Sequence, residues 1–295
     1  MTSGAVVLAG GRSSRMGTPK AALEWHGSTL LRRTVGIVAR ATGGPVVVVR
    51  AVGQDLPGLP KGTTVVDDPR EGKGPVQGIA AGLGALRDQA ESAFVTSTDL
   101  PFLHPAFVSG VLRVLGGPHG PGQQHPGQRR AGPDVVLPVA RGYQQPLAAA
   151  YRTGLAEVAE RLVKEDRLRP AFLFAECSVV RLDDTALLTD PVLAALDPDL
   201  DSVLNVNTPD DYQAARQRPA PEVTVRLFGA LVKTGRPAGP HLARAATIQA
   251  AADATGLPFD RHVTAALNGD QITRDPLTPL AAGDTVFFMS ADAGG

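Results

Sequence analysis

The stretch from Val6 to Lys20, which reads VVLAGGRSSRMGTPK, constrains the fold of this chain more than any other. A short β-branched run leads directly into a glycine-rich turn. The turn carries Arg12, Arg15 and Lys20, and no acidic residue follows before Glu24. Glycines let backbone N–H groups approach an anion, and arginine and lysine neutralise its charge. The stretch therefore predicts a buried strand followed by a triphosphate-binding loop.

The spacing within this loop excludes two commoner phosphate-binding motifs. A Walker A loop ends in Gly-Lys-Ser/Thr, whereas here Gly17 is followed by Thr18, Pro19 and Lys20. A dinucleotide-binding fingerprint needs Gly-x-Gly-x-x-Gly, which Ala9-Gly10-Gly11 does not supply.

Length and composition favour a two-domain globular protein. The chain has 295 residues, 43% of them hydrophobic, and no apolar run is long enough to span a bilayer. The N-terminus has no basic segment typical of a secretory signal, so we expect a cytoplasmic protein without a membrane anchor. Its 29 basic residues balance its 29 acidic ones, which argues against nucleic acid as a partner.

The cysteine and the histidines do not indicate a catalytic thiol, a disulfide or a zinc site. The single Cys177 cannot form an internal disulfide, and its apolar neighbours indicate a buried, small hydrophobic side chain. Six scattered histidines lack the spacing of zinc ligands.

Strands and helices alternate along the first part of the chain. Ser28 is a candidate N-cap for a helix that continues to about Ala41, and apolar runs at 45–49 and 63–66 predict strands. This alternation predicts an α/β fold with a doubly wound, mostly parallel sheet, whose site lies at the carboxyl ends of the strands.

Carboxylates follow two of the predicted strands. Asp67 precedes a glycine-rich loop that leads through Gly78 into a helix, and Asp99 ends the strand at 93–98. Mg²⁺ prefers one or two carboxylates together with phosphate oxygens and water, so Asp99 is the first candidate metal ligand. The alternatives are that Asp99 caps the next helix and that the glycine-rich segment is only a connector.

The rest of the chain predicts further strands and helices and then a second domain. Strands are expected at 134–139, 144–151 and 202–206, with helices at 153–165 and from Pro209, which Thr208 would cap. We place domain boundaries at 1–216 and 222–295, joined by a proline-containing linker at 217–221. The second domain should be an α+β roll, with strands at 222–229, 242–245, 263–267 and 285–289 and a helix at 247–255.

Residues 4–215 resemble the nucleotidyltransferases, in particular the molybdenum cofactor guanylyltransferases. The resemblance rests on LAGGRSSRMGTPK, on the segment after Asp67, on DLPFL from Asp99, on QPLAAAY from Gln145 and on NVNTPDDY from Asn205. It implies a Mg²⁺ ion held by Asp99 and Asn207, and an acceptor near Gln145 and Asn205. It also implies that the nucleotide lies against Leu8, Ala9, Gly10, Gly11, Arg12, Lys20, Asp67, Gly78 and Asp99.

The reaction implied by this resemblance is transfer of GMP from GTP to molybdopterin, with release of pyrophosphate. Arg15 and Lys20 would neutralise the triphosphate, and Asp99 would hold the metal. A CTP-dependent cytidylyltransferase is the closest alternative. That branch tends to have alanine where this chain has Gly10, and the missing methyl group favours a purine.

Residues 222–295 resemble the ubiquitin-like small subunit of molybdopterin synthase, which has a β-grasp fold. The resemblance rests on VRLFG, on LAAGDTVFF and on the terminal Gly294-Gly295. It implies a sulfur carrier whose tail is activated by an adenylating enzyme and used by the large subunit of the synthase. An alternative from a different functional class is a protein that acts mainly as a sulfur carrier. Its larger domain would then be a nucleotide-binding adaptor.

Overall fold

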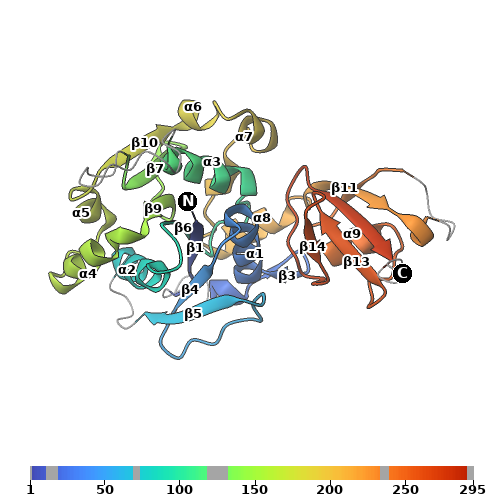
Figure 1. Ribbon diagram of the computed structural model, residues 1–295, viewed down its shortest axis with the longest axis horizontal. Coiled ribbons are helices and arrows are strands. Elements are labelled where there is room, and N and C mark those ends of the chain that lie inside the picture. The colour runs from blue at the N-terminus through green and yellow to red at the C-terminus, as the bar shows by residue number, and fades with distance from the viewer. Residues whose placement is uncertain (1, 11–18, 69–73, 118–131, 233–238, 291–295) are drawn as a thin grey trace. The chain divides into compact units, whose positions relative to one another are not determined.

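The computed structural model describes residues 2–10, 19–68, 74–117, 132–232 and 239–290. Contacts between residues divide the chain into two compact units (Figure 1). The first comprises Met1–Leu23 and Leu30–Pro209, and the second comprises Glu24–Thr29 and Asp210–Gly295. The short segment from Glu24 to Thr29 therefore belongs with the C-terminal part of the chain.

The first unit is built on an eight-stranded sheet in the order β10-β7-β9-β6-β1-β4-β5, with β8 paired to β7. Its strands are β1 (Ser3–Leu8), β4 (Val46–Ala51), β5 (Thr63–Asp68), β6 (Ser92–Ser97), β7 (Val135–Ala140), β8 (Tyr143–Gln144), β9 (Ala148–Arg152) and β10 (Val179–Asp183). Strand β1 pairs in parallel with β4 and β6, as do β4 with β5 and β7 with β10. Of the strands that the structure describes in this sheet, only β8 and β9 run antiparallel to their neighbours. The predicted mixed α/β fold with a mostly parallel central sheet is confirmed.

Helices cover both faces of this sheet, as expected for parallel strands. They are α1 (Leu30–Thr42), α2 (Pro75–Leu86), α3 (Pro105–Gly116), α4 (Ala156–Lys164), α5 (Pro170–Phe174), α6 (Asp184–Leu187) and α7 (Pro191–Leu196), with 3₁₀ turns η1 (Lys20–Ala22), η2 (Thr153–Leu155) and η3 (Asp201–Val203). Helices α2, α4 and α5 pack on one face, where Val6 and Leu8 are buried. Helices α1 and α3 contact each other, and the Phe94 and Phe107 rings meet edge to face, 6.3 Å apart.

Helix α2 lies unusually close to β1. A Cβ atom built on Gly82 would lie 2.2 Å from Val6 Cγ1, which is too close for any side chain. Glycine is therefore required at this position, because the helix backbone rests directly on the side chains of the strand.

The second unit contains a five-stranded sheet in the order β12-β11-β15-β13-β14. Its elements are β2 (Glu24–Trp25), β3 (Ser28–Thr29), α8 (Pro209–Gln217), β11 (Glu222–Leu227), η4 (Gly229–Leu231), β12 (His241–Arg244), α9 (Ile248–Ala254), β13 (Val263–Leu267), β14 (Gln271–Thr273) and β15 (Thr285–Ser290). Strands β11 and β15 are parallel at the centre, and the other pairs are antiparallel. Thr247 caps α9 through a bond from Ala250 N to its Oγ1, and the helix packs Ile248 into the core.

Three expectations about local structure are wrong. Ser28 does not cap α1, because it lies in β3 and pairs with Trp25. The strand expected at 202–206 is replaced by η3 and an extended segment, since the carboxylate of Asp197 accepts bonds from Asp201 N (2.7 Å) and Ser202 N (3.1 Å). The strand expected at 144–151 divides into β8 and β9, because the chain turns where Ala148 N bonds to Gln145 O.

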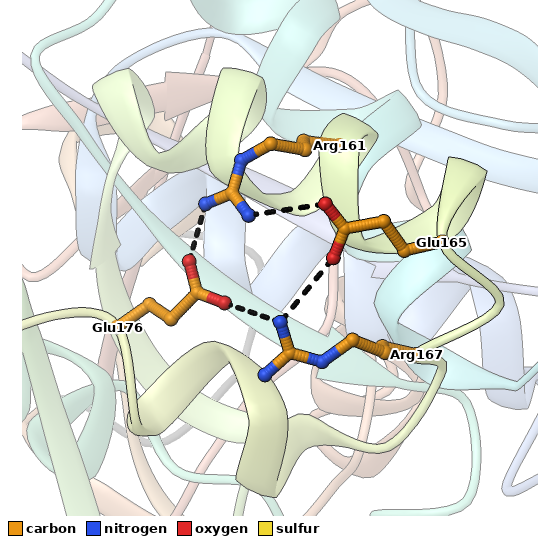
Figure 2. A network of polar contacts seen from close by, with 4 residues as sticks. All are labelled: Arg161, Glu165, Arg167 and Glu176. Carbon is orange, nitrogen blue, oxygen red and sulfur yellow. Dashed lines mark hydrogen bonds and ion pairs between the residues drawn. The ribbon is translucent and has the colours of Figure 1, made fainter.

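An ion-pair network joins α4, the connector that follows it and the end of α5 (Figure 2). Glu165 accepts from Arg161 (3.4 Å) and Arg167 (3.3 Å). Glu176 accepts from Arg167 (2.6 Å) and also from Arg161. The hydrogen bond from Arg161 is the largest cause of a pKa of Glu176 below its ordinary range, and Arg167 adds to it.

Candidate functional site

The beginning of the predicted phosphate loop is fixed at the carboxyl edge of the sheet. Ala9 N and Gly10 N both donate to Val49 O, at 2.8 and 3.2 Å. Gln54, which the sequence did not single out, donates from Nε2 to Ala9 O (3.1 Å) and accepts at Oε1 from Ala51 N (3.0 Å). The end of β4 and the turn after it therefore position the chain that enters the loop.

Close packing explains why glycine occupies two of the predicted nucleotide-binding positions. A Cβ atom on Gly10 would lie 3.0 Å from Ala51 N, and one on Gly78 would lie 3.0 Å from Leu8 Cδ2. Gly78 and Leu8 are thus brought together, as expected for one site. The close approach of β4 accounts for Gly10, so this glycine does not by itself indicate a purine.

Lys20, Asp99 and Asn207, from three distant segments of the first unit, meet at the same edge. Lys20 Nζ donates to Asn207 Oδ1 at 2.9 Å and lies 3.7 Å from Asp99 Oδ2. The other carboxylate oxygen, Asp99 Oδ1, accepts a hydrogen bond from Ser97 Oγ. Ser97 was not among the predicted site residues, and its position two residues before Asp99 is the one signal for it in the sequence.

Backbone contacts hold this cluster in place. Val206 N donates to Asp99 O at 2.9 Å, which ties the Asn205–Asn207 segment to the end of β6. The buried Arg33 of α1 donates from Nε to Pro101 O at 2.7 Å, and this fixes the turn after Asp99. The two side chains proposed as metal ligands are therefore carried on segments bonded to each other.

The alternative in which Asp99 serves only as a helix cap does not fit the structure. The residue that caps α3 is His104, whose Nδ1 accepts from Ala106 N at 3.1 Å. His104 N in turn donates to Ser202 Oγ at 3.0 Å. Asp99 lies before this turn and has no part in capping α3.

The loop that leads to Asn207 is organised by a buried carboxylate. Burial raises the pKa of Asp197, and hydrogen bonds from Ser202 and Asp201 oppose this effect. These bonds turn the chain at η3 and direct it toward Asp99.

Other predicted site residues lie apart from this cluster or outside the described residues. Asp67 is on edge strand β5, separated from β6 by β1 and β4, and forms an ion pair with Arg50 Nε at 2.8 Å. Gln145 donates from Nε2 to Ala140 O at 3.3 Å, and Asn205 is exposed. Gly11, Arg12, Arg15, Gly294 and Gly295 lie outside the described residues.

The donor set suits a hard cation that keeps other ligands. No group of three or more His, Cys, Asp or Glu side chains able to hold a metal occurs in the described part of the chain. Asp99 and Asn207 offer one carboxylate and one amide oxygen, and an ammonium group already lies between them. Mg²⁺ is commonly bound by one or two carboxylates with phosphate and water oxygens, so these residues fit it.

Cys177 is half-buried rather than fully buried as predicted. Burial, together with the nearby carboxylates of Asp134 and Glu176, raises the pKa of its thiol to about 11. A thiol with this pKa is protonated at neutral pH and is not a nucleophile. The interpretation of Cys177 as an inert side chain agrees with this environment.

The structure contains, among the residues it describes, no helix that is both long and apolar enough to cross a membrane.

These features define a class of protein. The first unit has a mostly parallel α/β sheet, a glycine-rich and basic sequence after its first strand, and a lysine and a carboxylate at the same edge. These features are typical of a nucleotide-binding transferase. The family described as MobA-like NTP transferase domain matches residues 5–179, and the chain belongs to this family.

Curated relatives match the same part of the chain. A probable molybdenum cofactor guanylyltransferase of Methanosarcina acetivorans is 30% identical over 224 residues, covering 71% of this chain and 88% of the relative. A protein of the same name from Mycobacterium avium is 34% identical over 161 residues, covering 54% of this chain and 73% of the relative. The crystal structure of molybdopterin-guanine dinucleotide biosynthesis protein A from Archaeoglobus fulgidus shares the fold. Its TM-score is 0.52 at 23% identity, covering 72% of this chain and 97% of that one.

Proposed function

We propose that the protein transfers GMP from GTP to the terminal phosphate of molybdopterin bearing molybdenum, and releases pyrophosphate. The observation that carries this proposal is the meeting of Lys20, Asp99 and Asn207 at the edge of the sheet where β1 ends. The relatives carry the name probable molybdenum cofactor guanylyltransferase, and this supports GTP over CTP as the substrate.

Catalysis would consist of positioning and charge neutralisation. The acceptor phosphate attacks the α-phosphorus in line with the departing pyrophosphate, and no covalent enzyme intermediate is required. Lys20 binds the triphosphate, with Arg15 as its predicted partner from the loop. Ser97 orients the carboxylate of Asp99. Asp99 and Asn207 would hold Mg²⁺, which when bound neutralises charge on the phosphates.

The test is pyrophosphate release with Mg²⁺, molybdate-charged molybdopterin and each of GTP, CTP, ATP and UTP. We expect release with GTP, and a loss of about 10³-fold in Asp99→Asn, because that change removes the charge at the centre of the site. Asp88→Asn is the matched control, since Asp88 is an exposed carboxylate beyond the C-terminus of α2, before β6 begins. A preference for CTP would place the protein with the cytidylyltransferases, and full activity in Asp99→Asn would contradict the proposed site.

A second function is proposed for the C-terminal unit, as a ubiquitin-like sulfur carrier with a β-grasp fold. It is supported by the sheet order, with β11 and β15 parallel at the centre, flanked by antiparallel strands and packed against α9. Its tail, Gly294-Gly295, would be adenylated and converted to a thiocarboxylate, because glycines let a chain end enter a narrow channel. The partners would be an adenylating enzyme and the large subunit of molybdopterin synthase.

Mass spectrometry after incubation with an adenylating enzyme, ATP and a sulfur donor tests the carrier proposal. The expected product has sulfur in place of one oxygen of the Gly295 carboxylate, and a variant without Gly294 and Gly295 should not acquire it. Thiocarboxylate formation without any pyrophosphate release from GTP would favour the alternative, in which the first unit is a nucleotide-binding adaptor.

A further inference from the structure

The ammonium group of Lys20 lies where the proposed metal ligands converge. It donates to Asn207 Oδ1 at 2.9 Å and is 3.7 Å from Asp99 Oδ2. These are the two oxygen atoms assigned above to the divalent cation. One side chain that is expected to bind the triphosphate is thus engaged with both metal ligands.

We propose that Lys20 competes with the divalent cation for Asp99 and Asn207 and therefore has two positions in the reaction cycle. In the first its ammonium bridges the two oxygens, and in the second it binds the triphosphate while the cation takes its place. This inference rests on the metal site proposed above, and it adds a role for Lys20 before the nucleotide is bound.

Electrostatics makes the two occupants mutually exclusive. An ammonium and a divalent cation about 4 Å apart or less repel each other strongly where water is partly excluded. The Lys20 and Asp99 side chains are 18% and 21% exposed, so solvent screens this repulsion only in part. Lys20 must move away when the cation binds.

The contacts of the three residues indicate that Lys20 is the group that moves. Ser97 holds Asp99 Oδ1, and the bond from Val206 N to Asp99 O fixes the segment that carries Asn207. Lysine instead places its charge at the end of a flexible four-carbon chain. The oxygens therefore stay in place while the ammonium is exchanged for the cation.

A consequence is that the protein without nucleotide binds the cation weakly. The triphosphate gives the ammonium another anionic partner, and this releases Asp99 and Asn207. Nucleotide and cation should then each favour the binding of the other, as linkage requires.

The test measures Mn²⁺ binding to the full chain without nucleotide, by electron paramagnetic resonance of the free ion. In Lys20→Met, which keeps the aliphatic chain and removes the charge, we expect Mn²⁺ to bind about tenfold more tightly than in the wild type. Lys61→Met is the matched control. It removes one positive charge from an exposed turn before β5, at the opposite end of the strands, and should leave Mn²⁺ affinity unchanged.

Equal or weaker Mn²⁺ binding in Lys20→Met would overturn the inference, and so would a gain of the same size in Lys61→Met. Lys20→Gln serves as a second neutral variant if the methionine variant does not fold. Asp99→Asn should lose the binding, and a variant that kept it would show that the metal site itself is misplaced. Guanylyl transfer by the wild type is measured separately, so failure of the competition leaves the proposed function standing.

Discussion

The hydroxyl group of Ser97 orients the carboxylate at the centre of the site. Ser97→Ala removes the hydrogen bond to Asp99 Oδ1, and Asp99 can then rotate away from the direction of Asn207. Groups that orient a metal ligand typically contribute about 10–100-fold in metal affinity or activity, and we expect a loss in this range. The measurements are kcat for pyrophosphate release, which should fall, and the Kd for Mn²⁺, which should rise.

Ser97→Thr is the matched control, because threonine keeps the hydroxyl group. Rescue of both values by threonine would support the orienting role. A full loss with alanine and no rescue with threonine would instead indicate that this position responds to any change in packing.

The environment of Cys177 predicts a thiol that reacts slowly with alkylating reagents. Its pKa is raised to about 11, so the reactive thiolate is scarce at neutral pH. We expect alkylation by iodoacetamide at pH 8 to be at least about tenfold slower than that of a free cysteine, and to accelerate as the pH rises toward 11. Rapid, stoichiometric labelling at pH 7 would contradict this environment.

The sequence predicted the charged and amide side chains at the centre of the site, but not the residues that hold them in place. The chemistry of Lys20 and Asp99 was predicted from their residue types, and Asn207 was implied by the family resemblance. The structure brings the three side chains together. Ser97, Gln54 and Arg33 are ordinary residues in sequence. Their roles depend on partners 2, 45 and 68 positions away, which only the folded chain supplies.

At the scale of elements, the packing of α2 on β1 makes opposite predictions for two glycines of one helix. Gly82→Ala would place a Cβ atom 2.2 Å from Val6 Cγ1, which forces the helix and the strand apart. We expect a destabilisation of about 1–3 kcal/mol, as for other overpacked cores. The measurement is the free energy of unfolding in urea.

Gly84→Ala is the matched comparison, because its Cβ atom would only approach Glu160 Oε1, at 3.6 Å. Alanine is the better helix former, so this variant should be neutral or more stable by up to about 1 kcal/mol. If both variants lost equal stability, the cost would reflect helix α2 in general rather than its contact with Val6.

The ion-pair network of α4 and α5 predicts a stability that depends on pH and salt. The pKa of Glu176 is lowered in the folded state, so its contribution is present above the ordinary value of 4.5 and is lost as the pH falls through the folded value. We expect Glu176→Gln to lower the Tm at pH 7 and at low salt, because it removes the shared partner of Arg161 and Arg167 (Figure 2).

The difference in Tm between wild type and Glu176→Gln should shrink as the pH falls below the ordinary carboxyl pKa of 4.5. It should also shrink in about 1 M salt, which screens charges separated by more than about 3 Å. A difference that stayed constant across both conditions would show that the network contributes nothing electrostatic and that the glutamine disturbs packing instead.

Elements with strong local signals could be predicted, and elements made by tertiary contacts could not. The buried runs Ala5–Leu8 of β1 and Val46–Val49 of β4 are continuous and apolar, and α9 follows Thr247, where the sequence predicts the start of a helix. Strand β14 and helix α6 are only three and four residues long. Segments this short carry too few residues for a periodic pattern, so the packing around them decides their structure.

At the scale of the whole molecule, the division into two units does not follow the order of the sequence, because Glu24–Thr29 belongs with the residues from Asp210 onward. The hairpin of β2 and β3, which interrupts the first unit in sequence, contacts α8. Tyr212 Oη donates to Glu24 O at 2.6 Å, and Arg216 forms an ion pair with Glu24 at 2.6 Å. A truncation that is meant to isolate the transferase must therefore keep α8.

The match to the MobA-like family ends at residue 179, and the first strand of the five-stranded sheet, β11, begins only at Glu222. We expect a chain of residues 1–221 to fold and to release pyrophosphate from GTP within about twofold of the full protein, as an independent domain should. A chain of residues 1–208 would lack Tyr212 and Arg216 and should unfold at a lower temperature, because the Glu24 hairpin loses both partners.

Circular dichroism melting and the pyrophosphate assay on both truncations separate the outcomes. A chain of residues 1–221 that folds but is inactive would mean that the C-terminal sheet contributes to transfer. Residues 217–221 would then separate two folding units that are both needed for activity. Equal melting of both truncations would mean that the hairpin needs no support from α8. We expect activity in the longer chain and a lowered Tm in the shorter one, because the transferase should be complete at the end of α8 and the five-stranded sheet follows it.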